Sequence, residues 1–134
     1  MIRITRLLTL VYVLALIVVG GSGVFIAEWE LQHVFALDTA ALAPSVEATL
    51  LNQYRFLKAI EFAAGVVCLI GFERIFGEPR ITRLFLLLVG AGAAARVLAI
   101  VADGWPEPVF LIFLALELAV FVLVALHHVR HRNG

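Results

Sequence analysis

The chain is dominated by four long apolar stretches that alternate with short polar segments. The apolar stretches cover residues 7–27, 50–72, 84–102 and 109–126. The first has no charged residue and would be about 31 Å long as a helix, which is enough to cross a hydrocarbon core. Charged residues interrupt the other three, and the second carries most of them. This pattern predicts an all-α fold, a bundle of four transmembrane helices.

Composition supports a membrane location. Of the 134 residues, 63% are hydrophobic, and the mean hydropathy of +1.08 is far above that of a soluble domain. We therefore expect a single integral membrane domain over residues 1–134. The sequence lacks a Walker loop, a dinucleotide fingerprint, an HExxH motif and paired CxxC motifs, which excludes the commoner nucleotide and zinc enzymes. We predict no cofactor, no metal site and no nucleic-acid partner.

The distribution of basic residues predicts the orientation. Basic residues cluster at the cytoplasmic ends of membrane helices, and the loops here divide into a basic and an acidic set. The acidic set comprises residues 28–48 and 103–108. We therefore predict a multi-pass protein of the cell inner membrane with both termini in the cytoplasm. The basic set is Arg3, Arg6, Arg74, Arg80, Arg83, Arg130 and Arg132.

The segments between the spans carry further signals. Residues 28–48 form an acidic external loop, in which Trp29, His33, Val34 and Leu37 have the spacing of a short amphipathic helix on the membrane surface. Ser45 is the expected N-cap of the next helix. We expect a polar turn over residues 73–83 and a second external turn over residues 103–108.

Small residues occur in two of the spans. Gly20, Gly21, Ser22 and Gly23 end the first stretch, either as a surface for close helix packing or as the cleavage region of a signal peptide. Residues 90–95 give the third span a small-residue face that packs on a helix of this chain or of a partner. Cys68 stands alone in an apolar run, where a packing role is expected.

Five ionisable side chains lie inside the spans, where each charge costs roughly 2.5–3.5 kcal/mol unless it is paired or faces a polar interior. Arg96 would lie roughly 9 Å, Glu117 roughly 12 Å and Glu61 roughly 16 Å below the outer helix ends. Three cations against two anions predict a net-cationic pocket in the outer half that binds an anionic or amphipathic small molecule or a lipid. The five are Arg55, Lys58, Glu61, Arg96 and Glu117, and Asn52 and Tyr54 lie in the same outer half.

Three alternatives compete with a binding pocket. In the first, the charges only hold the helices together, with Arg96 paired to Glu117 or Glu61, Lys58 paired to the remaining acid, and Arg55 extended to the lipid headgroups. The second is an accessory subunit, or a homo-oligomer, that packs through the small-residue faces. In the third, a small membrane enzyme uses Glu61 or Glu117 as a proton shuttle.

The histidines near the C-terminus suggest a metal only weakly. His127 and His131 lie one helical turn apart, with His128 between them. The neighbouring Arg130 and Arg132 disfavour a cation, and basic residues at this end of a span serve topology and contacts with anionic lipids.

Two stretches of the sequence resemble a known family. They are residues 52–58, with an aromatic–arginine start to the second span, and residues 92–117, which include Ala95, Arg96 and the Asp103–Gly104 turn. Both resemble the small bacterial four-helix membrane proteins catalogued as domain of unknown function 4345. The resemblance implies recurring polar positions, and it adds Asp103 to the predicted ligand-binding residues. Lys58 and Glu61 depart from it, since many relatives have small residues there. The family carries no activity, so the resemblance implies only fold and location. The recurring positions are Arg55, Arg96, Asp103, Gly104 and Glu117.

Overall fold

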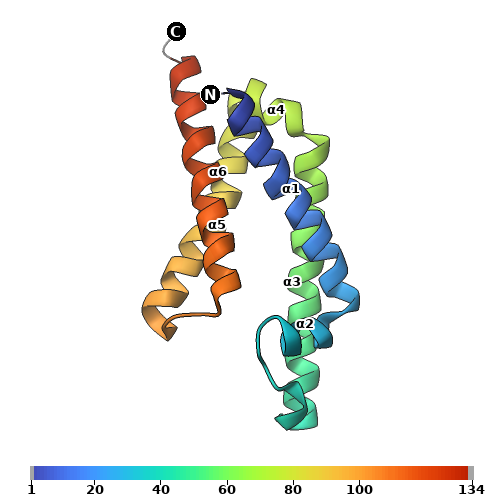
Figure 1. Ribbon diagram of the computed structural model, residues 1–134. Coiled ribbons are helices and arrows are strands. Elements are labelled where there is room, and N and C mark those ends of the chain that lie inside the picture. Colours follow the sequence, from blue (N-terminus) through green and yellow to red (C-terminus); the bar gives the residue numbers. More distant parts are fainter. Residues whose placement is uncertain (1, 133–134) are drawn as a thin grey trace. The chain divides into compact units, whose positions relative to one another are not determined.

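The computed structural model describes residues 2–132, and Figure 1 shows that this part of the chain is built from helices joined by short loops. It contains no strand. The helices are α1 (Ile2–Phe25), α2 (Ala27–His33), the 3-10 helix η1 (Thr39–Ala41), α3 (Pro44–Ile70), α4 (Phe72–Gly77), α5 (Pro79–Asp103) and α6 (Pro108–Arg132). The all-α prediction is confirmed.

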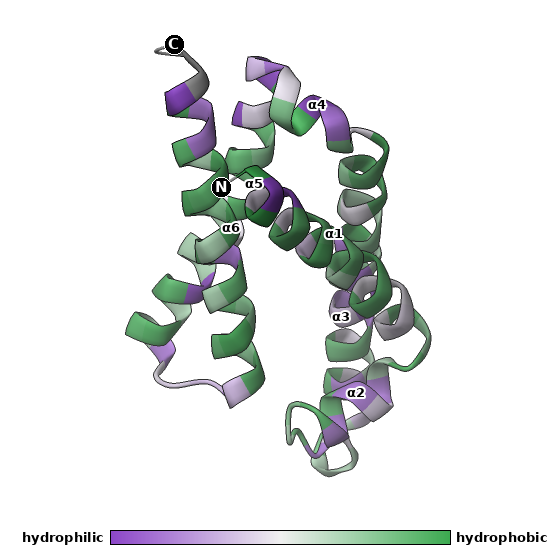
Figure 2. Cartoon of the chain, turned by 45° about the horizontal axis from the view of Figure 1, so that its top comes forward, coloured by the Kyte–Doolittle hydropathy of each residue, from purple (hydrophilic) through white to green (hydrophobic). Residues whose placement is uncertain are grey.

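Three helices are long and apolar enough to cross a membrane, as judged by length and composition within the described residues. They are Ile2–Phe25, Pro79–Asp103 and Pro108–Arg130. Figure 2 shows hydrophobic residues along most of these helices and hydrophilic residues on α2 and α4. Helix α3 is longer than any of the three, but its charged residues, which lie between Glu47 and Glu61, lower its mean hydropathy.

Helix α3 begins close to the helix start that the sequence predicts, but with a different capping residue. Helix α3 begins at Pro44, so Ser45 lies inside the helix, and its predicted role as the N-cap is wrong. Proline suits a first helical position because its φ angle is already helical and the helix needs no N–H there. The carbonyl of Ala43 accepts the first hydrogen bonds, from the amides of Val46 and Glu47.

The polar turn expected over residues 73–83 is mostly helical. Helix α4 occupies Phe72–Gly77, and α5 begins at Pro79, so the prediction of a turn is wrong apart from Glu78. The buried Thr82 hydroxyl donates to the Ile75 carbonyl at 2.7 Å, and Ile75 is only 1% exposed. Alternating Gly, Pro and Arg residues suggested a loop, but burial of Ile75 and this hydrogen bond hold a compact helical corner.

The segment predicted as an external loop over residues 28–48 also contains helix. Helix α2 begins at Ala27 and ends at His33, so Val34 and Leu37 lie outside it. The Gln32 side chain donates to the hydroxyl of the buried Thr39 at 2.8 Å and thereby links α2 to η1. The short amphipathic helix is therefore confirmed in part.

The chain forms two compact units, which we describe separately. The first unit comprises the residues up to Tyr12 and from Cys68 onward, and the second is Val13–Val67. Helix α1 contributes to both.

In the first unit, α5 and α6 pack along each other as neighbours, joined by the short connection 104–107. The turn predicted at this place is confirmed, and Gly104 ends α5 with a φ of 98°, which glycine adopts without steric cost. A Cβ atom at Gly90 would lie 3.0 Å from the Phe121 ring, and one at Gly92 would lie 3.7 Å from the Glu117 carboxylate. The small-residue face of the third span therefore packs on a helix of the same chain.

The N-terminal end of α1, helix α4 and the C-terminal end of α6 meet at one end of the first unit. Arg6 forms an ion pair with Glu73, and its guanidinium lies 5.3 Å from the centre of the Phe76 ring. Phe76 in turn contacts His127 edge to face, with 5.8 Å between the ring centres. Aromatic packing and one ion pair thus bring both ends of the described chain to the same end of this unit.

In the second unit, the last two turns of α1 cross α3 at close range. A Cβ at Gly20 would lie 2.5 Å from the Phe62 backbone nitrogen, and one at Gly65 would lie 2.7 Å from Ile17. Such contacts are only available to glycine. The predicted packing role of the small residues at the end of the first span is confirmed, and Gly65 completes the contact from α3.

Candidate functional site

The ion pair between Arg96 and Glu117 is the charged centre of the first unit. Arg96 Nε lies 3.2 Å from Glu117 Oε1 and 3.0 Å from Oε2, so one nitrogen donates to both carboxylate oxygens. The Glu117 side chain is 7% exposed and that of Arg96 is 29% exposed. Of the two partners expected for Arg96, Glu117 and Glu61, the structure shows Glu117.

The terminal nitrogens of the Arg96 guanidinium are not held by Glu117. Within the described residues, neither terminal nitrogen of Arg96 has a hydrogen-bond partner. The guanidinium carbon lies 5.8 Å from the centre of the Phe110 ring and 5.4 Å from that of Phe113, both on α6. The side chain is therefore held on one side by a carboxylate and two aromatic rings, while its two terminal amino groups remain free to donate.

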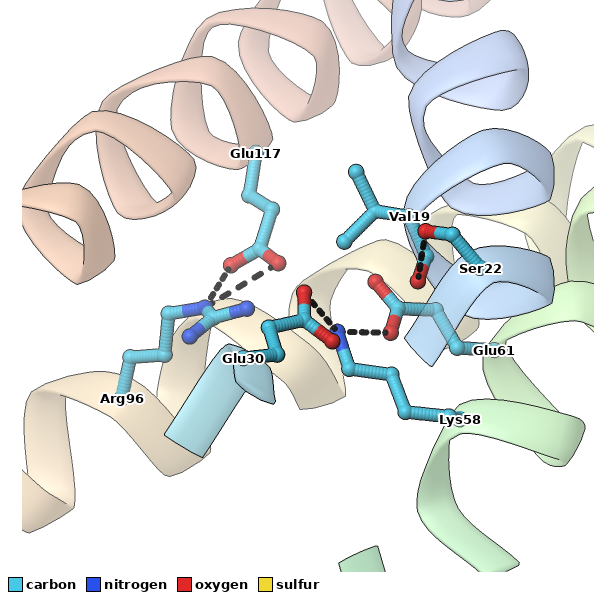
Figure 3. Close-up of polar contacts among 7 residues, drawn as sticks. All are labelled: Val19, Ser22, Glu30, Lys58, Glu61, Arg96 and Glu117. Carbon is cyan, nitrogen blue, oxygen red and sulfur yellow. Dashed lines mark hydrogen bonds and ion pairs between the residues drawn. The ribbon is translucent and has the colours of Figure 1, made fainter. Parts of the chain in front are cut away.

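A second group of charges lies within the second unit, where Figure 3 shows Lys58 between two carboxylates. Lys58 Nζ is 3.1 Å from Glu61 Oε2 and 3.8 Å from Glu30 Oε1. The side chains of Lys58 and Glu30 are each only 9% exposed. The predicted pairing of Lys58 with Glu61 is confirmed, whereas Glu30 is an additional partner. Both candidate proton shuttles, Glu61 and Glu117, are thus ion-paired.

Glu30 is the site residue that sequence reasoning missed. It was assigned to a solvated acidic loop, but as a residue of α2 it is 7% exposed. The short helix was predicted with Trp29 and His33 on its apolar face. The face that is buried instead holds Ala27, Glu30 and Leu31, since residues three and four apart share a face. Two side-chain oxygens in this group are buried without a hydrogen bond of normal distance and angle among the described residues: Glu30 Oε2 and the Tyr54 hydroxyl.

The space for this group is provided by a glycine. A Cβ at Gly23 would lie 2.6 Å from Lys58 Cδ and 2.7 Å from Glu30 Oε2. The Tyr54 ring supports Lys58 from α3, with Nζ 5.4 Å from the ring centre, and Phe35 contacts that ring edge-on at 5.9 Å. We call Glu30, Lys58, Glu61 and Tyr54 the Glu30 cluster.

Three further residues of the predicted site are exposed. Arg55 and Asn52 line a surface hollow of about 590 Å³ on α3, together with Ala48, Leu51 and Phe56. Arg55 forms no ion pair within the described part of the chain. Asp103 is exposed at the end of α5. The structure therefore separates Arg55 from Lys58 by burial, although Arg55 lies only three positions before Lys58 in the sequence.

The histidine cluster is only partly described. His127 is 6% exposed and packs on Phe76, while the side chain of His131 lies outside the described residues. Among the side chains that the structure describes, no group of three or more His, Cys, Asp or Glu residues is arranged to hold a metal ion.

Comparison with known proteins assigns the chain to a family. The family model described as Domain of unknown function (DUF4345) matches residues 4–128, almost the whole chain. The protein belongs to the DUF4345 family. This confirms the resemblance seen in the two sequence stretches. No curated protein and no solved structure shows significant similarity to this DUF4345 protein.

Proposed function

We propose that this DUF4345 protein is a four-span protein of the inner membrane that binds a small anionic or amphipathic molecule through Arg96. The observation that carries the proposal is the geometry of that side chain. Glu117 holds Nε alone, and the two terminal nitrogens have no partner among the described residues.

Helix α3 is proposed as the fourth span because it is long enough and because Lys58 is buried while large apolar residues of the same helix are exposed. It has 27 residues and is therefore about 40 Å long. Lys58 is buried, while Leu57, Val67 and Ile70 are 62%, 69% and 83% exposed. A mean over the sequence counts the buried Lys58, but lipid would contact the exposed apolar residues, and the exposed Arg55 is long enough to extend toward the headgroups. The outer face is thus suited to a hydrocarbon environment.

Both termini are proposed to be cytoplasmic. The meeting of α1, α4 and α6 at one end of the first unit supports a common side for these segments, because Arg6 contacts Glu73 and Phe76 contacts His127. Arg74, Arg80 and Arg83 belong to α4 and the start of α5, and an excess of arginine marks the cytoplasmic side.

The free end of Arg96 suits a carboxylate or a phosphate. Arginine binds such planar or tetrahedral anions through two parallel N–H donors, and each charge-assisted hydrogen bond is about twice as strong as a neutral one. Phe110 and Phe113 place apolar surface next to this charge. A ligand with an anionic group for Arg96 and an apolar chain for the two rings, that is an amphipathic ligand, fits this arrangement best. Lys58 contributes less to anion binding, because two carboxylates already face it.

The proposal is tested by alkyl phosphate and alkyl carboxylate binding to the purified protein in a neutral detergent. Dodecyl phosphate and laurate should raise the unfolding temperature of the wild type, whereas an alkyl trimethylammonium salt should not. Arg96→Lys keeps the charge but loses the two-pronged donor, so the affinity should fall tenfold or more, equivalent to about 1.4 kcal/mol.

Arg83→Lys is the matched control, since Arg83 is exposed on the same helix and its Nε donates to the Pro79 carbonyl. This variant should bind like the wild type. Equal stabilisation of wild type and Arg96→Lys by dodecyl phosphate would overturn the proposal.

A second candidate function is that of an accessory subunit. The observation in its favour is an apolar groove of about 490 Å³ between α5 and α6, whose lining includes Gly90, Ala93 and Ala94. Small residues let a neighbouring helix approach closely in a membrane. Purification from native membranes in a mild detergent should then retain a defined partner, and Ala94→Leu should release it. A monomer under these conditions would exclude this function.

A further inference from the structure

The Glu30 cluster carries an uncompensated negative charge. Two carboxylates, Glu30 and Glu61, face one ammonium group, that of Lys58, which gives a formal charge of minus one. Tyr54 adds no charge. Glu30 and Lys58 are each 7% exposed, so water screens this excess poorly. A buried excess of one negative charge is stabilised by one further cation.

The unsatisfied oxygens of the Glu30 cluster indicate a cation that can donate hydrogen bonds. Glu30 Oε2 and the Tyr54 hydroxyl are buried, and neither has a hydrogen bond of normal distance and angle among the described residues, although the hydroxyl interacts with the Glu30 carboxylate. Glu30 is more than nine-tenths buried. A carboxylate oxygen only accepts, and a phenol oxygen can accept as well as donate. An ammonium group with its own N–H donors satisfies both oxygens and balances the charge. A bare alkali cation would need more oxygen ligands than these two.

The position of the cluster indicates where such an ammonium comes from. Helix α2 is a short helix between two long ones, and its Trp29 is 52% exposed, as is typical of aromatic residues at the level of lipid headgroups. On α3, Arg55 lies three residues before Lys58, about 4.5 Å along the helix axis. Arg55 and Asn52 line the exposed hollow beside the apolar Leu51 and Phe56. A cation and an amide next to apolar side chains suit a phosphate attached to acyl chains.

We infer that the second unit binds a zwitterionic phospholipid with a primary ammonium, the ammonium at Glu30 and Tyr54 and the phosphate at Arg55. This site is distinct from Arg96 in residues and in the sign of its charge. The experiment on this phospholipid site therefore succeeds or fails independently of the experiment on anion binding at Arg96. Phosphatidylethanolamine has this headgroup chemistry. Phosphatidylcholine differs in having a quaternary ammonium without N–H donors, which makes it the matched comparison.

The test measures unfolding temperature in nanodiscs made of phosphatidylcholine alone, or with part of it replaced by phosphatidylethanolamine or by phosphatidylglycerol. The wild type should be stabilised by a few degrees in phosphatidylethanolamine relative to both other lipids. Glu30→Gln should lose this preference, because an amide lacks the negative charge. Glu28→Gln removes an exposed carboxylate from the same helix and should keep the preference. A general effect of phosphatidylethanolamine on the bilayer would persist in Glu30→Gln.

Two additions keep the inference testable. If Glu30→Gln does not fold, Tyr54→Phe removes only the hydroxyl and should reduce the preference. Free ethanolamine added to phosphatidylcholine nanodiscs distinguishes the source: stabilisation there would support the ammonium chemistry but assign it to a soluble amine. Equal stability of the wild type in phosphatidylethanolamine and phosphatidylcholine, without an effect of ethanolamine, would overturn the inference. The inference would also be overturned if sodium ions stabilised the wild type equally in all of these lipids.

Discussion

At the scale of single residues, Glu117 determines how Arg96 can act. A carboxylate that accepted from both terminal nitrogens would occupy the whole fork of the guanidinium. Here Glu117 accepts from Nε alone, so it fixes the side chain and leaves the end of the fork for another anion. Glu117 is therefore better described as a positioning residue for Arg96 than as a free acid.

This view predicts non-additive effects of substitutions in the pair. Glu117→Gln should lower the free energy of unfolding by about 1–3 kcal/mol, because a partly buried cation loses its charged partner. Arg96→Met together with Glu117→Leu should cost less than the sum of Arg96→Met and Glu117→Leu, because the double variant leaves no unpaired charge. Unfolding in detergent at increasing denaturant concentration measures these values. Additive losses would show that the two side chains do not interact energetically.

At the scale of elements, the crossing of α1 and α3 depends on glycine at the contact. Gly20 and Gly65 bring the two backbones close together, and Gly23 leaves room for the aliphatic part of Lys58. The same crossing thus stabilises the second unit and allows a long charged side chain to be buried within it. Packing and the candidate site are linked through these three positions.

Gly20→Ala should therefore destabilise the protein by about 1–3 kcal/mol, the usual cost of overpacking a close contact. Its Cβ would lie 2.5 Å from the backbone nitrogen of Phe62, which cannot move independently of α3. The measurement is the unfolding temperature in detergent. Gly77→Ala is the control, since a Cβ there meets nothing within 4 Å. Equal stability of the two variants would show that α1 and α3 do not approach closely at Gly20.

At the scale of the whole molecule, the distribution of charge and apolar surface decides the topology. Helices α1, α5 and α6 meet the length and composition of a membrane span, while α3 has the length but carries charges between Glu47 and Glu61. If α3 crosses the membrane as proposed, the segments before and after it lie on opposite sides. This is the point at which the proposed four-span topology can be tested most directly.

Single-cysteine labelling in a Cys68→Ala background tests this topology. Ser45→Cys and Glu107→Cys should react with a membrane-impermeant maleimide added to intact cells, because both positions are exposed and lie in the proposed external segments. Glu78→Cys and Arg130→Cys should react only after the membrane is permeabilised. Labelling of Ser45→Cys and Glu78→Cys from the same side would exclude α3 as a span.

The sequence by itself determined the class of protein, the approximate extent of the long helices and the identity of most charged residues within them. Apolar stretches of this length allow few alternatives, because backbone groups in a membrane must be satisfied within a helix. The sequence limited the partner of Arg96 to Glu117 or Glu61, whose predicted depths are similar, and the structure shows that it is Glu117. The family membership followed from short polar motifs and is confirmed over most of the chain.

Only the tertiary structure decided which charges are buried and which groups they meet. Glu30 lies in a segment whose composition is that of a solvated loop, and its burial depends on α2 and on the space left by Gly23. Arg55 and Lys58 are indistinguishable by local composition, but one is exposed and the other buried. The physical reason is that burial of a charge depends on partners distant in sequence, whereas the length of an apolar helix depends on its own residues.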